Sequence, residues 1–435
     1  MKYTKKDLGS FDLHMINTDK FKTITVRVVF HTPIIKEEIT KRNLISDILL
    51  QSSEKYSSKR DLTIEAEDLY AADISTNNNR LGNYIFTSFH LQVLQDKYTE
   101  EGNLEKAFEF LSEIIFHPDV TKEGFKKDKL ELVKSNAEIA LDSLKEDATA
   151  YSLIRMAEAF DKENPISYRM TGYKEDLDDI DERNLYESYL NMINNDYVDI
   201  FVVGDYDKKE MLSLIKKYFK FKKIKKQKTS YLIKEKKCRG RRLFAKETID
   251  NTQSKLAIAC TLNKLTEYER NYPLVLANII LGGGPDSKLF KEVREKNSLC
   301  YTIHSISNKL DNVLIISAGI NKDNFDKTVN IITESINSMK KGKFTDQDIK
   351  MAKELYNTSA EELEENENRI INEYLYEEIL GLEPIEERVK KMSKVTKHQI
   401  TKVCKKIGMD TVFLLEGVND ENNWFKRIRH FLLYR

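Results

Sequence analysis

The chain alternates between short apolar runs rich in β-branched residues and longer segments with helical periodicity. The first apolar run, FKTITVRVVF at 21–30, predicts a strand because β-branched and aromatic residues favour extended backbone. A turn at Pro33 follows. Beyond it, apolar residues recur at the 3.6-residue spacing of a helix, at Leu44, Ile45, Ile48 and Leu49. The pattern predicts a strand followed by an amphipathic helix.

The same order of elements recurs in the second half of the chain. A strand pattern at 255–260 (KLAIAC) precedes an apolar segment at 273–281 (PLVLANIIL). Each half closes on a helical pattern and then a strand: 182–193 and 197–203 in the first half, 397–407 and 411–415 in the second. This repetition predicts two similar α+β domains.

The halves are separated by a strongly basic stretch, which places the first domain at 1–215, a linker at 216–242 and the second domain at 243–435. A basic run of this kind can bind nucleic acid or anionic lipid. The other interpretation is a solvated linker that lies against a neighbouring domain. The rest of the chain balances its charge, so we favour the linker and expect neither nucleic acid nor membrane as a partner.

Composition supports a globular protein. The 435 residues are 40% hydrophobic and 33% charged, with 71 basic and 71 acidic side chains, so no net field favours nucleic acid. We find no apolar run long enough for a secretory signal or a transmembrane helix, and the four cysteines form no C-x-x-C pair. These features predict a cytoplasmic protein, and the Lys, Asn and Ile content hints at an AT-rich bacterial genome.

The histidines are too far apart to form a helical zinc site. The closest two, His14 and His31, are 17 positions apart. An H-x-x-E-H or H-E-x-x-H site needs two imidazoles on adjacent turns of one helix, with a glutamate that activates water. We therefore predict no metal site. All seven histidines are His14, His31, His90, His117, His304, His398 and His430.

The segment 281–301, LGGGPDSKLFKEVREKNSLCY, carries the most specific motif of the chain. It resembles the C-terminal domain of the inverzincin peptidases, which include pitrilysin, insulin-degrading enzyme and the mitochondrial processing peptidase. Segments 164–177 and 196–205 resemble other parts of that family. The resemblance covers about residues 20 to 420. It implies two homologous α+β domains, each a mostly antiparallel sheet covered by helices, that form half of a clam-shell chamber.

The resemblance fails where the family binds zinc. By position, the first helix of the chain, at 41–50, places Leu44 and Ile48 at the two histidines and Asp47 near the glutamate. Aliphatic side chains cannot ligate zinc. Glu131 and Glu138 lie in the helix that would supply the third ligand, but without histidines they are better explained as solvent-facing residues.

Arg294 and Tyr301 match an arginine and a tyrosine that, in active relatives, bind substrate and stabilise the oxyanion across the chamber. The alternative for Arg294 is a surface ion pair with Glu295 or a neighbouring acid, and for Tyr301 packing within a strand. Within this motif we favour catalysis in trans, with a zinc ion held by a partner.

Gly282, Gly283 and Gly284 precede this pair, and Ser287 follows them. Glycines permit positive φ angles and close backbone approach. They lack the G-K-[ST] ending of a phosphate-binding loop, so a tight turn explains them better. The resemblance implies that these four residues contribute to substrate binding.

Together these observations predict a non-catalytic subunit of a heterodimeric zinc metallopeptidase that cleaves short, unfolded peptides. This chain would hold no cofactor, and a homologous partner would hold the zinc. The alternative is a catalytically silent peptide-binding or scaffold protein that acts as a homodimer. An intact Arg/Tyr motif favours the first reading, since a scaffold does not need it.

Overall fold

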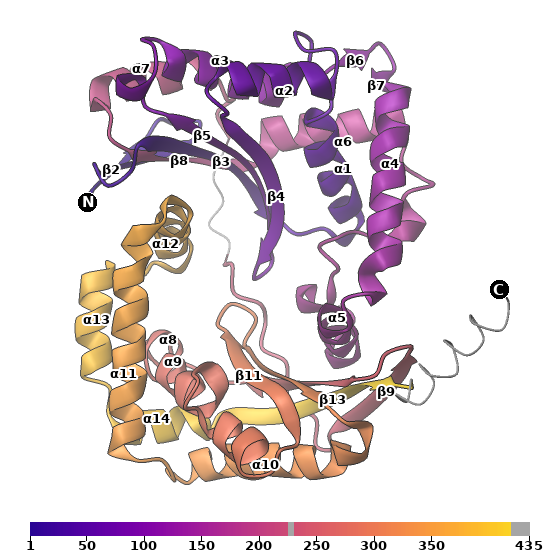
Figure 1. Ribbon diagram of the computed structural model, residues 1–435, viewed down its shortest axis with the longest axis vertical. Coiled ribbons are helices and arrows are strands. Elements are labelled where there is room, and N and C mark those ends of the chain that lie inside the picture. The colour runs from indigo at the N-terminus through magenta and orange to yellow at the C-terminus, as the bar shows by residue number, and fades with distance from the viewer. Residues whose placement is uncertain (225–229, 419–435) are drawn as a thin grey trace, which may run out of the picture. The chain divides into compact units, whose positions relative to one another are not determined.

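The computed structural model describes residues 1–224 and 230–418 (Figure 1). The chain forms two compact units, and neither unit is continuous in sequence. Unit 1 contains Met1–Asp142, Arg169–Tyr231 and Leu363–Leu382. Unit 2 contains Ser143–Tyr168, Leu232–Glu362 and the chain from Glu383 onward.

Unit 1 is built on a six-stranded sheet in the order β1-β2-β8-β3-β5-β4. The β2–β8 pair is parallel and the other pairs are antiparallel. β3 pairs with β5 over its full length, from Thr23 opposite Leu94 to Pro33 opposite Tyr84. The strands are β1 (Lys2–Asp7), β2 (Asp12–Asn17), β3 (Thr23–Pro33), β4 (Asp73–Leu81), β5 (Tyr84–Leu94) and β8 (Tyr197–Gly204).

The central strand β3 is apolar on both faces because helices cover both. Val26, Val28 and Phe30 belong to a core shared with α1, α3 and α6, while Val29 faces a second cluster with α12. A strand covered on both faces loses the simple alternation of apolar and polar residues. The helices of unit 1 are α1 (Ile39–Leu49), α2 (Lys59–Asp68), α3 (Asn103–Phe116), α4 (Lys127–Asp142), α6 (Glu182–Asn195), α7 (Lys208–Tyr218) and α12 (Glu367–Leu380). A two-stranded ribbon, β6 (Val120–Thr121) with β7 (Gly124–Phe125), completes it.

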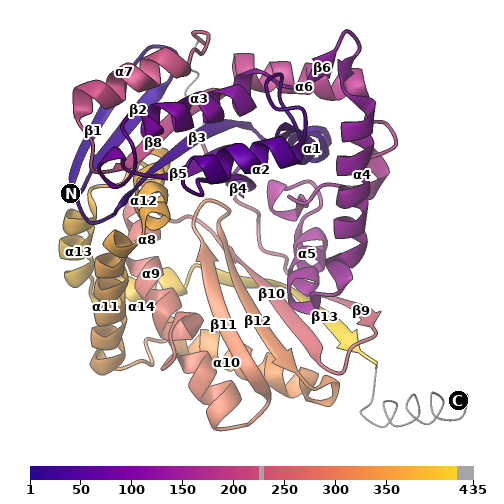
Figure 2. The ribbon, with the colours of Figure 1, turned by 45° about the horizontal axis from the view of Figure 1, so that its top comes forward.

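Unit 2 repeats this topology with five strands in the order β11-β12-β10-β13-β9, which Figure 2 displays side by side. The β9–β13 pair is parallel and the remaining pairs are antiparallel. The order corresponds to β4-β5-β3-β8-β2 of unit 1, so the predicted α+β fold with two homologous domains is confirmed. The strands are β9 (Leu243–Ile249), β10 (Ser254–Leu262), β11 (Cys300–Asn308), β12 (Val313–Ile320) and β13 (Ile407–Gly417).

The helices of unit 2 include two π-helical segments in the region of the Arg/Tyr motif, at Ile279–Gly283 and Phe290–Glu295. π-Helical turns are uncommon and are frequent at functional sites. The α-helices are α5 (Ala148–Phe160), α8 (Glu267–Asn271), α9 (Pro273–Asn278), α10 (Phe325–Lys340), α11 (Asp346–Glu361), α13 (Ile385–Ser393) and α14 (Lys397–Cys404).

Each unit contains one helix from the other half of the sequence. α5 lies in the first half, yet Tyr151, Met156 and Phe160 pack against β10 and β13 of unit 2. α12 lies in the second half, yet Ile370 and Ile371 pack against the sheet of unit 1. The ranges 1–215 and 243–435 therefore describe sequence halves, whereas the compact units exchange these helices.

The basic stretch 216–242 is described except for residues 225–229, which lie outside the described residues. Its first residues end α7, and its last part lies along β13 of unit 2. There the Arg239 backbone N–H donates to Asp410 Oδ2 at 2.8 Å, and Lys236 Nζ lies 3.4 Å from the same oxygen. In the described part of the chain, no helix combines the length and the apolar character that crossing a bilayer requires.

Candidate functional site

Helix α1 forms where the zinc helix was expected, but its inner face is hydrocarbon. Leu44 is fully buried and Ile48 is 3% exposed, and both belong to the main core of unit 1. Asp47 is solvent-exposed. The positions that hold zinc-binding histidines in the resembling family are thus filled here by core side chains, which offer no lone pair to a metal.

A buried ion pair fixes α1. Arg42 and Asp196 are 3% and 4% exposed, and the guanidinium donates to both carboxylate oxygens, at 2.5 and 3.0 Å. One turn further, Ser46 Oγ accepts a 2.8 Å hydrogen bond from the amide of Asn78 on β4. These contacts make α1 a rigid structural element of the core.

The candidates for the third zinc ligand are exposed on α4. Glu131 has no role in the core, and Glu138 pairs with Lys174 at 2.9 Å. Across residues 1–224 and 230–418, no group of three His, Cys, Asp or Glu side chains could hold a metal ion. The residues present therefore do not fit the zinc centre of the inverzincin peptidases.

Two of the seven histidines share one carboxylate, an arrangement that the sequence did not reveal. His14 on β2 and His31 on β3 flank β8, where Asp199 Oδ1 lies 2.9 Å from His14 Nε2 and Oδ2 lies 2.7 Å from His31 Nε2. The outer ring nitrogens face tyrosine hydroxyls, Tyr3 at 2.8 Å and Tyr231 at 3.3 Å. Each imidazole therefore has two partners, which identifies the cluster as a structural network of the sheet.

The electrostatics of this network centre on Asp199. Burial alone would raise the pKa of the carboxyl, but hydrogen bonds from the two imidazoles outweigh burial and hold its pKa well below the usual range. Only pairing between neighbouring strands brings the three residues together, because 168 positions separate His31 from Asp199.

Arg294 and Tyr301, by contrast, lie together. Arg294 lies in the π-helical segment Phe290–Glu295, and its guanidinium carbon lies 4.6 Å from the centroid of the Phe290 ring and 5.3 Å from that of Tyr301. Tyr301 occupies a bulge at the start of β11, where the pairing with β12 shifts between Cys300 and Ile303. β-Bulges commonly redirect a side chain beside an active site.

The surroundings of this pair bear on the two structural alternatives, packing of Tyr301 within a strand and an ion pair of Arg294 with Glu295. Tyr301 is 73% exposed, so it does not pack within the sheet. Within the described chain, the charged group of Arg294 contacts the Phe290 and Tyr301 rings, and we find no ion pair between it and Glu295. The Tyr301 phenol is therefore exposed to solvent, beside the half-buried Arg294, at the edge of unit 2.

The glycines are explained by close packing. None of Gly282, Gly283 and Gly284 has a positive φ angle. A Cβ on Gly282 would lie 2.7 Å from Ser305 Oγ on β11 and 2.9 Å from Leu289 Cδ1. A larger residue would therefore push the turn away from the strand that carries Tyr301.

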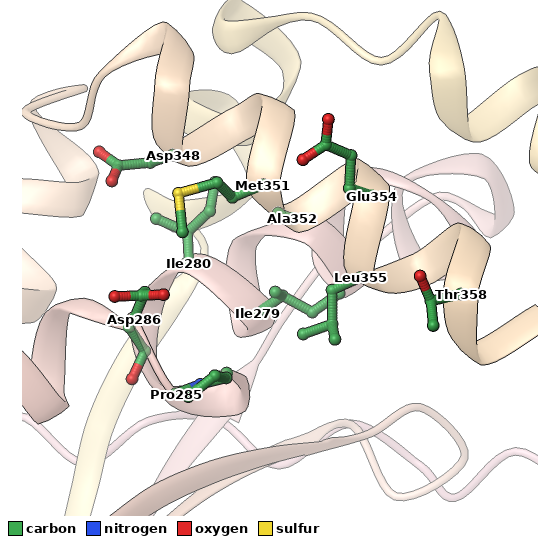
Figure 3. A pocket seen from close by; sticks show the side chains of 12 residues that line it. Ile279, Ile280, Pro285, Asp286, Asp348, Met351, Ala352, Glu354, Leu355 and Thr358 are labelled. Carbon is green, nitrogen blue, oxygen red and sulfur yellow. The ribbon is translucent and has the colours of Figure 1, made fainter.

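Gly284 and Ser287 also line a cavity of about 290 Å³ (Figure 3). Gly282 and Gly283 are not part of its wall. Ser287 is 3% exposed, and its Oγ has no hydrogen-bond partner among the described residues. The structure thus separates the four predicted binding residues into two that pack the turn and two that border a cavity.

Comparison with known proteins identifies relatives over nearly the full length. The Peptidase M16 inactive domain matches residues 179–356. The "Probable inactive metalloprotease YmfF" of Bacillus subtilis is 30% identical over 421 residues, covering 95% of this chain and 97% of that protein. The "Uncharacterized zinc protease YmxG" of the same organism is 23% identical over 290 residues, or 65% of this chain and 68% of that protein.

Solved structures share the fold. A conserved protein from Enterococcus faecalis V583 superposes with a TM-score of 0.87 at 26% identity, covering 96% of this chain and all of that one. A peptidase M16 inactive domain from Pseudomonas fluorescens superposes with a TM-score of 0.77 at 15% identity, covering 96% and 98% of the two chains. Both cover the two units described above.

Proposed function

Because this chain belongs to the peptidase M16 family as a member without the zinc-binding motif, we propose that it is the non-catalytic subunit of a heterodimeric zinc metallopeptidase. In this proposal a homologous partner carries the zinc site. This chain supplies Arg294 and Tyr301 to the substrate bound there. The observation that carries the proposal is the contact between half-buried Arg294 and exposed Tyr301 in a chain whose zinc-ligand positions hold Leu44 and Ile48.

The chemistry assigned to the pair follows from the charge that develops during peptide hydrolysis. Attack on a peptide carbonyl places negative charge on its oxygen, and preorganised donors aimed at that oxygen lower the barrier. The guanidinium of Arg294 offers five N–H donors in a fixed plane, and the Tyr301 hydroxyl offers one. Stacking of the guanidinium on the Tyr301 ring supports this role because it restrains both groups before substrate arrives.

The substrates we propose are short, unfolded peptides in the cytoplasm. An extended peptide can present one carbonyl to both donors, whereas a folded protein would have to unfold locally to do so. Gly284 and Ser287, which border the cavity beside the Arg294 helix, are proposed to contact the same peptide. Gly282 contributes indirectly by keeping the turn close to β11, and Gly283 by leaving room for Asn278.

The test is recovery of the natural partner. The tagged chain is purified from its own cells, the co-purifying protein is sequenced, and the reconstituted pair is assayed on a peptide library. The proposal expects a near-stoichiometric partner of similar length with an H-x-x-E-H motif, and hydrolysis that needs both chains. Recovery of the chain alone or as a self-pair would support the alternative, a peptide-binding scaffold without chemistry.

A further inference from the structure

The cavity in unit 2 combines an apolar interior with an acidic rim. It lies between the turn that follows the π-helical segment Ile279–Gly283 and helix α11 (Figure 3). Its apolar wall consists of side chains from both elements: Ile279, Ile280, Pro285, Met351, Ala352 and Leu355. Leu355 is 36% exposed although it is a large aliphatic residue on a packed helix. The cavity therefore leaves hydrocarbon surface in contact with water.

The charged residues of the wall are all acidic. Asp286, Asp348 and Glu354 line the cavity, and none of its lining residues is Lys, Arg or His. Asp286 and Asp348 come from the turn and from α11, and Figure 3 shows their carboxylates at the same end of the cavity, with Thr358 at the other. A ligand that spans the cavity thus meets hydrocarbon along its length, two carboxylates at one end, and the Glu354 carboxylate on α11 away from that end.

These carboxylates have oxygen atoms that can still bind a cation. Asp348 Oδ2 accepts hydrogen bonds from the Thr345 backbone N–H at 2.7 Å and from its hydroxyl at 2.9 Å, which leaves Oδ1 available. Lys291 approaches Asp286 only to 3.9 Å, and Lys350 approaches Glu354 only to 3.8 Å. Exposed pairs at these distances contribute little and exchange readily with solvent.

We propose that this cavity binds the side chain of a lysine residue in a peptide ligand. Lysine carries a compact ammonium on a flexible four-carbon stem. The stem would lie along Ile279, Ile280 and Leu355, and the ammonium would reach Asp286 and Asp348. The volume of about 290 Å³ is just below the range for small-molecule cavities, roughly 300–1,000 Å³, so it suits one side chain.

This inference rests on the proposed function, because it assumes a peptide ligand. It adds a preference for lysine at one position of that peptide. Gly284 and Ser287, which border the cavity, precede the π-helical segment Phe290–Glu295, which contains Arg294. In this proposal the peptide held at Arg294 and Tyr301 places a neighbouring side chain in the cavity. Glutamate at that position would be repelled, and norleucine would fill the apolar part but leave the carboxylates unpaired.

The experiment measures binding of three otherwise identical pentapeptides, with lysine, norleucine or glutamate at the central position, to the full-length protein by isothermal titration calorimetry. The expected order is lysine, then norleucine, then glutamate, with lysine about fivefold tighter than norleucine. The double variant Asp286→Asn/Asp348→Asn should remove the preference for lysine. Asp346→Asn, on the same helix but outside the cavity wall, should leave it unchanged.

Equal affinity for lysine and norleucine, or a preference that survives in the double variant, would overturn the inference. Hexylammonium titrated alone distinguishes a free amine from a peptide side chain. If hexylammonium binds and none of the peptides does, the peptide occupant is wrong. The proposed function fails separately, through the absence of a zinc-bearing partner or of hydrolysis by the reconstituted pair.

Discussion

The guanidinium carbon of Arg294 lies 5.3 Å from the centroid of the Tyr301 ring, although the two residues are seven positions apart and a chain reversal joins them. The reversal depends on Ser298, whose φ of 51° is in the left-handed region. Its N–H donates to the Arg294 carbonyl at 2.9 Å. Local backbone geometry thus presents both side chains from one short segment.

Removal of either donor should slow hydrolysis by the reconstituted pair of subunits. We expect Arg294→Ala to lower kcat by about 10²–10³, the typical effect of losing one donor to an oxyanion. Tyr301→Phe removes only the hydroxyl and should lower kcat while KM changes little. Steady-state kinetics on a cleaved peptide, with assembly checked by gel filtration, measures both effects.

The controls for these variants are an arginine and a tyrosine of unit 2 that lie outside the motif. Arg241→Ala removes an exposed guanidinium, and Tyr268→Phe removes the hydroxyl of a tyrosine that is 39% exposed. Both should retain full activity. Full activity of Arg294→Ala as well would show that the pair has no catalytic role and belongs to the surface of unit 2.

The zinc-helix positions should behave as core residues. Leu44→Ala and Ile48→Ala each remove buried methyl groups from the main core of unit 1, and we expect each to lower the free energy of unfolding by about 2–5 kcal/mol. Denaturant unfolding followed by a probe in unit 1 measures the change. The matched control is Ile139→Ala on α4, where the isoleucine is 65% exposed, and its effect should be within about 0.5 kcal/mol. Similar, small effects at all three positions would mean that α1 is not packed as described.

A chelator should affect the isolated chain differently from a zinc enzyme. A metal that binds only the folded state raises stability in proportion to the logarithm of its concentration over Kd. Treatment of the isolated chain with EDTA should therefore leave its thermal midpoint unchanged, because the described residues offer no group that could hold a metal. The same treatment should abolish hydrolysis by the reconstituted pair. One zinc per isolated chain in elemental analysis would contradict the proposed half-site.

The sequence predicted those features that lie in continuous segments. The helix at 41–50 forms as α1, and the inward positions of Leu44 and Ile48 follow from their spacing. Arg294 and Tyr301 lie in one short motif, so their proximity needs no long-range information. The similarity of the two sheets also follows, since the repeated order of strands and helices predicts two homologous α+β domains.

Features that depend on distant pairing could not be predicted. The Asp199 carboxylate joins His14 and His31 only because β8 lies between β2 and β3, and neither histidine belongs to a recognisable motif. The exchange of α5 and α12 could not be predicted either. An amphipathic pattern indicates that one face of a helix is buried, but it does not indicate which sheet buries it. The glycines at 282–284 permit several turns, and the close approach to Ser305 becomes evident only in three dimensions.

The Asp199 network should make unit 1 sensitive to acid. The pKa of this carboxyl is lowered in the folded state, so its contribution is complete above the ordinary value of about 3.9 and is lost as the pH falls below it. Asp199→Asn should cost about 1.5–3 kcal/mol at pH 7, since it weakens a hydrogen bond to a charged group. The variant should also lose less stability than the wild type between pH 4 and pH 2.5.

Urea midpoints across this pH range, compared for both proteins, test the prediction. Asp68→Asn, an exposed residue of α2, controls for a change in net charge and should follow the wild-type curve. Parallel curves for Asp199→Asn and the wild type would show that the carboxylate does not contribute to the acid dependence.

The exchanged helix α12 should be required for unit 1 to fold. Besides its apolar contacts, Glu367 is 5% exposed and accepts hydrogen bonds from Thr23 at 2.9 Å and from Gln92 at 2.6 Å. A fragment of residues 1–231 lacks α12, so Val29 and Phe201 become exposed to water. Exposure of a large apolar side chain lowers the free energy of unfolding by about 1.5–3 kcal/mol. Several such losses are comparable to the whole stability of a domain.

We therefore expect the fragment 1–231 to show no cooperative unfolding transition by circular dichroism. Fusing residues 363–382 to its C-terminus through a flexible linker should restore the transition. The same fusion with Ile370→Glu and Ile371→Glu, which places charges in the contact with the sheet, should not. Cooperative unfolding of the unfused fragment would mean that the sequence half, with its boundary near residue 215, folds independently and that α12 only covers a finished domain.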